Sequence, residues 1–178
     1  WYGLSWAVGM IAAFHVMLHL TRFTDFTREN LDKLANYMIL GAIIGARLGH
    51  ILFYDPIYYF QNPIEILPIK LQPSFQFTGL AGMASHGGII GCLLALYLFH
   101  RKYKQNIWWI LDRLIIAGAV TGGFFRLGNL MNSEIIGTAS EVPWAFVFTR
   151  VDMVPRHPAQ LYEAVFYFVI AMLLYHLR

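Results

Sequence analysis

Five stretches of the chain are apolar enough and long enough to form helices that cross a membrane. A membrane-spanning helix needs about 20 predominantly apolar residues. The candidate stretches are residues 1–20, 34–53, 80–99, 107–130 and 160–177. Because only helices and closed barrels span lipid, this pattern predicts an all-α, polytopic integral membrane helix bundle with about five transmembrane helices.

The composition supports the same class. The 178 residues are 58% hydrophobic and 13% charged, whereas a soluble domain averages about 25% charged residues. The net charge is only +3, and the basic residues do not form one stripe, so no nucleic-acid partner is expected. The one cysteine, Cys92, excludes an internal disulfide and a cysteine-based metal site, and neither a metal nor a cofactor is expected. We expect a single membrane-embedded domain over residues 1–178, from a chain that opens at Trp1 as a fragment or trimmed product.

The charges of the connections predict an orientation. Basic residues concentrate in the first and third connections, as Arg22, Arg28, Lys33, Arg101, Lys102 and Lys104, whereas the second connection has only Lys70. The positive-inside rule then places the first and third connections and the C-terminus in the cytoplasm and the N-terminus outside. With this orientation Arg126, Arg47 and His86 lie toward the outer leaflet, so we expect a site that opens there.

Residues 122–137, GGFFRLGNLMNSEIIG, place a polar cluster directly after an apolar run. An arginine at the centre of a bilayer costs roughly 3 kcal/mol on insertion scales, so intramembrane charges mark functional sites by default. The guanidinium of Arg126 suits a phosphate or a carboxylate, and Asn129 and Asn132 add neutral donors and acceptors. The alternative is a structural ion pair between Arg126 and Glu134.

Two further polar residues interrupt the predicted helices. His86 precedes Gly87 and Gly88, and its imidazole could act as a general base; alternatively it is a buried, hydrogen-bonded histidine beside a glycine packing surface. Arg47 lies among Gly41, Gly45 and Gly49, whose spacing of four predicts close helix packing. Its alternative role is a bridge to an acid on a neighbouring helix.

The last predicted helix opens with PRHPAQLYEA, residues 155–164. Pro158 suits the first helical turn, and Arg156 and His157 precede that turn. Gln160, Tyr162 and Glu163 lie within it. The alternative for this segment is an ordinary polar helix cap.

Taken together, these segments resemble the prolipoprotein diacylglyceryl transferase family. The resemblance rests on WYGLSWAVGM, GARLGHILFYD, SHGGIIG, GGFFRLGNLMNSEIIG and RHPAQLYEA, which occur in the family's order and cover nearly the whole chain. There are departures: Phe125 stands where the family often has glycine, and the loop between Glu141 and Arg156 is short. The family also continues with one or two more helices after this point.

The resemblance implies an enzyme of the bacterial cytoplasmic (inner) membrane with its active site toward the outer leaflet. Such an enzyme moves the diacylglyceryl group of phosphatidylglycerol to the lipobox cysteine of a prolipoprotein signal peptide, and it releases glycerol phosphate. The implied catalytic residues are His86, Arg126 and Arg156. The implied substrate-binding residues are Tyr2, Arg47, Gly87, Gly88, Asn129, Asn132, Glu134, Gly137, Gln160, Tyr162 and Glu163.

Two other function classes compete with this interpretation. A catalytically silent phospholipid-binding protein of the same fold would keep the same motifs. A small-anion channel or transporter would favour internal repeats and polar residues through both leaflets. The chain has no such repeat, and the inner halves of its predicted helices are mainly apolar, which argues against transport.

Overall fold

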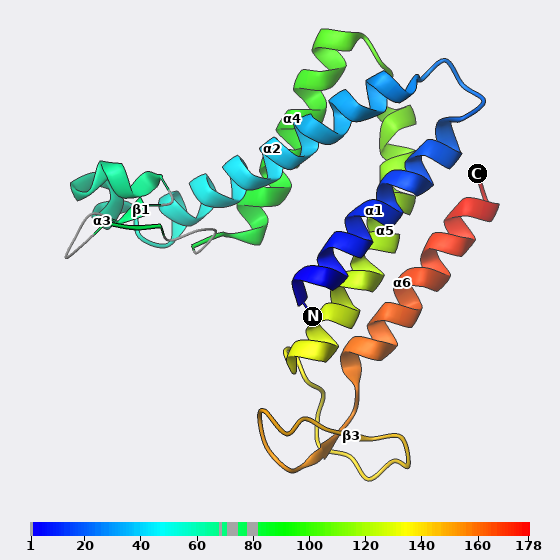
Figure 1. Cartoon of the computed structure of the whole chain (residues 1–178). Coiled ribbons are helices and arrows are strands. Elements are labelled where there is room, and N and C mark those ends of the chain that lie inside the picture. Colours follow the sequence, from blue (N-terminus) through cyan, green and yellow to red (C-terminus); the bar gives the residue numbers. More distant parts are fainter. Residues whose placement is uncertain (1, 68, 71–74, 78–81) are drawn as a thin grey trace. The chain divides into compact units, whose positions relative to one another are not determined.

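The structure is a computed structural model that describes residues 2–67, 69–70, 75–77 and 82–178. Its helices are α1 (Tyr2–Thr21), α2 (Arg28–Phe53), α3 (Pro56–Gln61), the short 3₁₀ helix η1 (Pro63–Ile66), α4 (Ser85–Tyr103), α5 (Ile107–Asn132) and α6 (Ala159–His176) (Figure 1). Two short antiparallel pairs complete it, β1 (Ile69–Lys70) with β2 (Gln76–Phe77) and β3 (Phe146–Val147) with β4 (Pro155–Arg156). Trp1, Leu80 and the side chain of Tyr2, which belong to the predicted spans and site, lie outside the described residues.

The predicted fold class is confirmed: the chain is an all-α, polytopic membrane protein. Four helices in the described part of the chain are long and apolar enough to cross a membrane, at Gly3–Thr21, Arg28–Phe53, Ile107–Asn132 and Ala159–His176. The fifth predicted stretch forms α4, which is not among these four. Its 19 residues begin with Ser85 and His86, and its last turn contains His100, Arg101 and Lys102; these polar residues lower its mean hydropathy.

One helix starts earlier than its hydrophobic stretch. The apolar pattern begins near residue 34, but α2 begins at Arg28. Lys33 and Glu29, one turn apart, form an ion pair at this end of the helix. Nζ of Lys33 lies 2.6 Å from Oε1 of Glu29. Pairs of this spacing stabilise a helix by about 0.2–0.5 kcal/mol.

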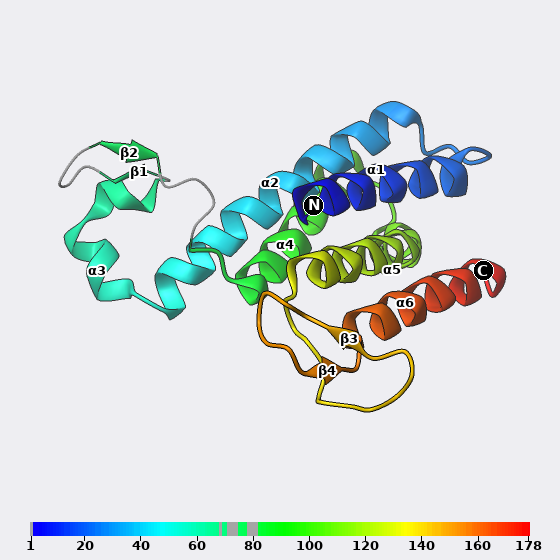
Figure 2. The same cartoon turned by 60° about the horizontal axis from the view of Figure 1, so that its bottom comes forward.

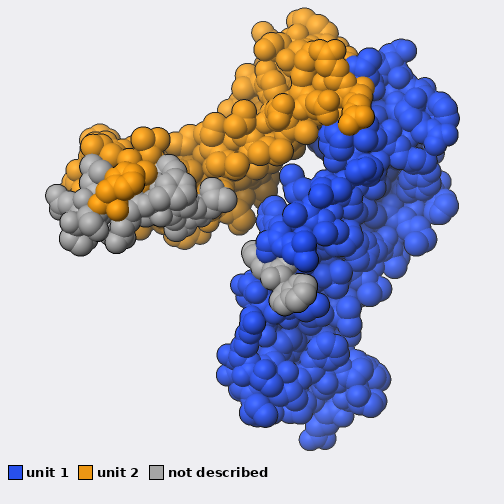
Figure 3. Space-filling model, in the orientation of Figure 1, with its two compact units in different colours: residues 1–27, 108–178 blue, residues 28–107 orange. Residues whose placement is uncertain are grey.

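The chain divides into two compact units, and each is described by itself (Figure 3). The first unit, Trp1–Thr27 with Trp108–Arg178, contains α1, α5 and α6. In it α1 runs beside α5, since a Cβ at Gly9 would lie 3.0 Å from the Cβ of Phe124. α5 in turn runs beside α6 (Figures 1 and 2). The ring of Phe168 lies against Gly123 at this contact. The glycines let bulky aromatic rings approach the backbone, so the three helices share a close interface.

The second unit, Arg28–Ile107, contains the crossed pair α2 and α4. The two helices meet through glycine: Gly41, Gly45 and Gly49 of α2 face Gly87 and Gly91 of α4 with backbone against backbone. The backbone N–H of Ala84 also donates to the carbonyl oxygen of Ala46 at 2.9 Å. This confirms the close packing that the spacing of four predicted.

Candidate functional site

The site in the first unit is built on an unusual end of α5. The N–H of Ser133 donates to the carbonyl oxygen of Leu130 at 3.2 Å, and that of Glu134 donates to the carbonyl oxygen of Asn129 at 3.0 Å. This pairing is a Schellman motif, which usually has glycine where Ser133 stands. Ser133 and Ile135 both have positive φ angles, of 59° and 54°. A β-branched residue such as Ile135 rarely adopts this conformation, and strained residues cluster at functional sites.

Glu134 is the centre of a hydrogen-bond network that joins α5 to α6. Its carboxylate accepts from Nδ2 of Asn129 at 2.9 Å and from Nδ2 of Asn132 at 3.0 Å. Its backbone oxygen accepts from Nε2 of Gln160 at 2.5 Å. Residues predicted for the site from two separate motifs are therefore brought together around Glu134.

Arg126 forms an ion pair with Glu163. Arg126 lies one turn before Asn129 on α5, and Glu163 lies one turn after Gln160 on α6. Nε of Arg126 lies 2.7 Å from Oε2 of Glu163, although the two atoms are not aligned for a hydrogen bond. The expected alternative, a pair between Arg126 and Glu134, is not what the structure has, since Glu134 is held by the two asparagines.

Four buried side-chain atoms around this network have no hydrogen-bond partner in the described part of the chain. They are Nη1 of Arg126, Oδ1 of Asn129, Oε1 of Gln160 and Oε2 of Glu163, and only the last is close to an opposite charge, Nε of Arg126. Asn129 and Gln160 are 1% and 0% exposed. A buried polar atom without a partner costs about 1–3 kcal/mol, so such atoms need a ligand or water to explain them. Because the Glu163 carboxylate is paired with Nε of Arg126, one cationic donor and two neutral acceptors remain, and these suit an anion that carries hydroxyl groups.

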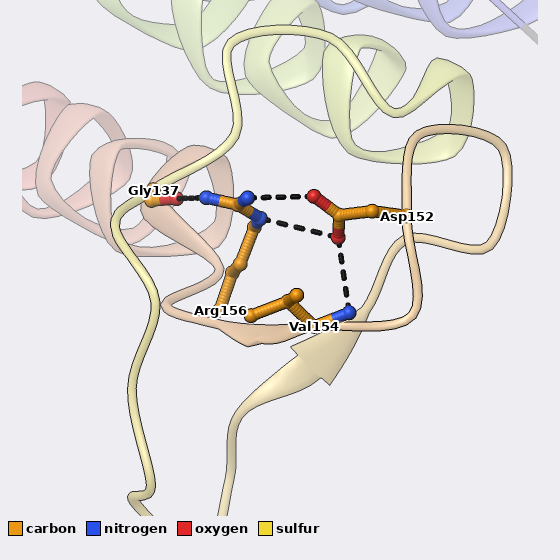
Figure 4. A network of polar contacts seen from close by, with 4 residues as sticks. All are labelled: Gly137, Asp152, Val154 and Arg156. Carbon is orange, nitrogen blue, oxygen red and sulfur yellow. Dashed lines mark hydrogen bonds and ion pairs between the residues drawn. The ribbon is translucent and has the colours of Figure 1, made fainter.

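Arg156, by contrast, is held by the protein (Figure 4). Its Nη2 and Nε bond the Asp152 carboxylate at 2.6 and 3.3 Å, and its Nη1 donates to the carbonyl oxygen of Gly137 at 3.4 Å. The carboxylate also accepts from the N–H of Val154 at 3.0 Å. The bond from Arg156, with that from Val154, holds the pKa of Asp152 below its ordinary value, and the pKa of Arg156 is raised in turn.

The same loop places two more predicted residues. Gly137 donates its N–H to the carbonyl oxygen of His157 at 3.2 Å, and a Cβ there would meet that oxygen and the Cβ of His157. The hydroxyl of Tyr162 accepts from Nε1 of Trp144 at 2.7 Å and lies 3.1 Å from Nδ1 of His157. Gly137 therefore allows a close strand approach, and Tyr162 faces the loop.

Arg47 lies in the second unit and binds backbone there. Its Nε, Nη1 and Nη2 donate to the carbonyl oxygens of Ile66 at 3.0 Å, Gly82 at 3.3 Å and Glu65 at 2.6 Å. Its guanidinium carbon also lies 5.2 Å from the centre of the Tyr59 ring. The sequence offered an ion pair with an acid on a neighbouring helix as the alternative role of Arg47. In the structure Arg47 instead donates to carbonyl oxygens of the segment between α2 and α4.

The SHGG residues have separate environments in the same unit. The ring of His86 is exposed and packs on Tyr54 and Phe53, with ring centres 5.9 and 5.1 Å apart. Gly87 is buried against Gly45 and Gly49, whereas a Cβ at Gly88 would meet only Ala42 and Ala46 at ordinary contact distances. His86 is thus not the buried histidine of the alternative, and Gly87 is part of the packing surface.

Sequence reasoning missed two residues of the first unit, Asp152 and Trp144. Both lie in the loop before α6, where no periodic pattern marks a role. The only signal in the sequence was the acid four positions before Arg156, a spacing that has no meaning unless the loop folds back on itself.

Comparison with known proteins gives a consistent result. The sequence model of the prolipoprotein diacylglyceryl transferase family matches residues 1–178. A phosphatidylglycerol–prolipoprotein diacylglyceryl transferase of Bacteroides fragilis is 48% identical over 177 residues, 98% of this chain and 64% of the relative. Proteins of the same name from Tolumonas auensis and Chloroherpeton thalassium are 48% and 43% identical, over 98% and 96% of this chain and 64% and 60% of their own length. The chain therefore spans less than two thirds of the curated relatives it matches.

Proposed function

This chain belongs to the prolipoprotein diacylglyceryl transferase family, and from that premise we propose that it moves the diacylglyceryl group of phosphatidylglycerol to a prolipoprotein cysteine. The relatives named above carry this activity in their names. In the reaction the thiolate sulfur attacks the carbon of the diacylated glycerol that bears the phosphate. A C–S bond forms as the C–O bond breaks, and glycerol phosphate leaves with the electron pair.

The observation that carries the proposal is the set of unpaired buried atoms at the ends of α5 and α6. The phosphate of phosphatidylglycerol would take the donor at Nη1 of Arg126, and the hydroxyls of its glycerol headgroup would supply donors for Oδ1 of Asn129 and Oε1 of Gln160. Arg126 would also stabilise the charge that develops on the leaving phosphate, an effect that is strong in a water-excluded site.

Glu163 and Glu134 support this assignment by orienting the groups that would touch the lipid. Glu163 lies beside Nε of Arg126 and leaves the outer nitrogens of the guanidinium for the phosphate. Glu134 fixes Asn129 and Asn132 through their donors, so the acceptor of Asn129 stays available. We propose a packing or tethering role instead for Gly87 and Arg47, whose contacts are with backbone.

His86 is the group that we propose takes the thiol proton. A free thiol has a pKa of about 8.5 and is mostly protonated at neutral pH, so a base raises the thiolate fraction. The exposed ring of His86 is accessible at the start of α4. A His86→Gln variant that keeps full turnover would remove this role.

We propose that the protein lies in the bacterial inner membrane with its N-terminus outside and the site toward the outer leaflet. The support is the alternation of basic connections along the chain. With the N-terminus outside, α5 runs outward from the cytoplasmic connection that carries Arg101 and Lys102, and Arg126 comes near its outer end.

The experiment is transfer of radiolabelled diacylglyceryl from phosphatidylglycerol to a lipobox peptide by the purified full-length protein. We expect labelled peptide with the wild type and a loss of about 10²–10³-fold with Arg126→Ala. A wild type that binds phosphatidylglycerol but transfers nothing would establish the lipid-binding alternative in place of the enzyme.

A further inference from the structure

The loop between α5 and α6 contains an ion pair that no motif predicted. Both groups belong to the loop itself: Asp152 precedes β4, and Arg156 ends it. Their side chains are 31% and 24% exposed, and two nitrogens of the guanidinium face the two oxygens of the carboxylate (Figure 4). This two-pronged contact fixes the plane of the guanidinium, which a single ion contact would not.

The fixed guanidinium reaches the strand that leaves α5. Its Nη1 donates to the carbonyl oxygen of Gly137, beside two backbone bonds that join the same segments. The N–H of Gly137 donates to the carbonyl oxygen of His157 at 3.2 Å, and the N–H of His157 donates to the carbonyl oxygen of Thr138 at 3.0 Å. Arg156 therefore stands where the segment after α5 is paired with the segment before α6.

This pairing sets the position of the residues around the unpaired atoms. Three residues before Gly137 is Glu134, whose carboxylate accepts from Asn129. Three residues after His157 is Gln160, whose amide nitrogen donates to the backbone oxygen of Glu134. A shift between the two paired segments would move Gln160 relative to Asn129 and so change the spacing of the two buried acceptors.

We propose that Asp152 and Arg156 are a positioning pair for the lipid site, in which Asp152 holds Arg156 on the Gly137 carbonyl and Arg156 does not itself bind the phosphate. This rests on the proposed function of the site. The proposal assigns a role to Asp152 and gives Arg126 and Arg156 different roles. Nη1 of Arg126 is unpaired among the described residues, whereas Nε, Nη1 and Nη2 of Arg156 each have a partner.

The two roles predict opposite changes in the apparent affinity for lipid. If Arg156 bound the phosphate, Asp152→Asn would release the guanidinium from its competitor and lower the KM for phosphatidylglycerol. If the pair positions the site, the same variant loosens the paired segments and raises that KM by about three- to tenfold, with the KM for the lipobox peptide unchanged. A merely structural loss of folded protein would change neither KM.

The test uses four variants of the full-length protein. They are Asp152→Asn, Arg156→Asp, the reversed pair Asp152→Arg with Arg156→Asp, and Arg150→Gln as the control. Arg150 is an exposed arginine of the same loop, with no hydrogen bond or ion pair in the ranges that the structure describes. We expect Arg156→Asp to lose about 10²-fold in transfer rate and Arg150→Gln to match the wild type. The reversed pair should recover little of that loss, because an aspartate at position 156 cannot donate to the Gly137 carbonyl oxygen.

Hydrogen exchange at the amides of Gly137 and His157 provides a readout that does not need transfer. We expect faster exchange at both amides in Asp152→Asn and wild-type exchange in Arg150→Gln. If the wild type transfers no label, the proposed function fails, while exchange still decides whether the pair holds the segments. A lower or unchanged KM in Asp152→Asn, a reversed pair that recovers the wild-type rate, or unchanged exchange would each overturn the proposal.

Discussion

The glycine-packed pair α2 and α4 and the polar junction of α5 with α6 both place arginine in or beside a membrane-spanning helix, but they use it differently. In the first region Arg47 donates to three backbone carbonyl oxygens. In the second, Arg126 keeps a buried nitrogen without a partner in the described part of the chain, next to two buried acceptors in the same state. A charge in a membrane protein is therefore not by itself evidence of a site. Arg126 is distinguished by an unpaired nitrogen that lies in the same network as unpaired acceptors of Asn129 and Gln160.

The largest effect on stability is expected in the glycine-packed pair. A Cβ at Gly91 would overlap the backbone oxygen of Gly41, and backbone cannot move aside as a flexible side chain can. Gly91→Ala should therefore force α2 and α4 apart and lower the free energy of unfolding by about 3 kcal/mol. Thermal unfolding in detergent measures the loss.

The matched control for that substitution is Gly118→Ala on α5. A Cβ at Gly118 meets no heavy atom within 4 Å among the described residues. Alanine is the better helix former by up to about 1 kcal/mol, so this variant should be as stable as the wild type or slightly more so. Equal losses in Gly91→Ala and Gly118→Ala would contradict the backbone contact between α2 and α4.

The next largest effect distinguishes two asparagines that share one partner. Both donate to Glu134, but Asn129 is buried and has an unpaired acceptor, whereas Asn132 is partly exposed. Asn129→Ala should lower the transfer rate by about 10- to 100-fold, because it removes both a buried bond and a predicted lipid contact. Asn132→Ala should lose only about threefold. If the two variants had equal rates, the unpaired acceptor would have no part in the site.

A smaller and differently located effect is expected for Arg47. Removing its side chain leaves the carbonyl oxygens of Glu65, Ile66 and Gly82 without this donor. Arg47→Ala should therefore speed limited proteolysis near residues 65–67 by about tenfold. The KM for phosphatidylglycerol should stay within about twofold of the wild type, since Arg47 binds backbone rather than lipid in this account.

The smallest effect is a pH dependence of the Asp152–Arg156 pair. Arg156, the charged group that faces Asp152, lowers the pKa of that carboxyl in the folded protein. The stabilisation is thus present above the ordinary aspartate pKa of about 4 and is lost as the pH falls through the lowered value. The difference in melting temperature between wild type and Asp152→Asn should be constant from about pH 7 to 5 and shrink below about pH 4. A difference as large at about pH 3 as at about pH 7 would exclude the carboxylate as its cause.

Local patterns in the sequence predicted the helices and the glycine surface well. Gly41, Gly45 and Gly49 repeat with the period of one helix face, so close packing follows from sequence alone. The start of α2 and the exclusion of α4 from the candidate spans followed from charged and polar ends, which a search for apolar stretches weighs poorly.

The partners of the polar residues were harder to predict. Glu163 reaches Arg126 from another helix, and Asp152 reaches Arg156 through a loop that folds back on itself. Such pairs depend on tertiary contacts that no periodicity encodes. The motifs named several of the residues that the structure groups around Glu134. Only the structure separates Arg126, with its unpaired nitrogen, from Arg156, which the protein holds.

The most direct measurement is the equilibrium affinity for phosphatidylglycerol in two matched variants, Arg126→Gln and Arg47→Gln. Each removes one guanidinium from a helix and keeps a polar side chain of similar length. The account predicts that Arg126→Gln weakens binding by about 10- to 100-fold, the value of a hydrogen bond to a charged group, while Arg47→Gln stays within about twofold of the wild type. Equal weakening in both variants, or unchanged binding in Arg126→Gln, would contradict the claim that the end of α5 holds the lipid phosphate.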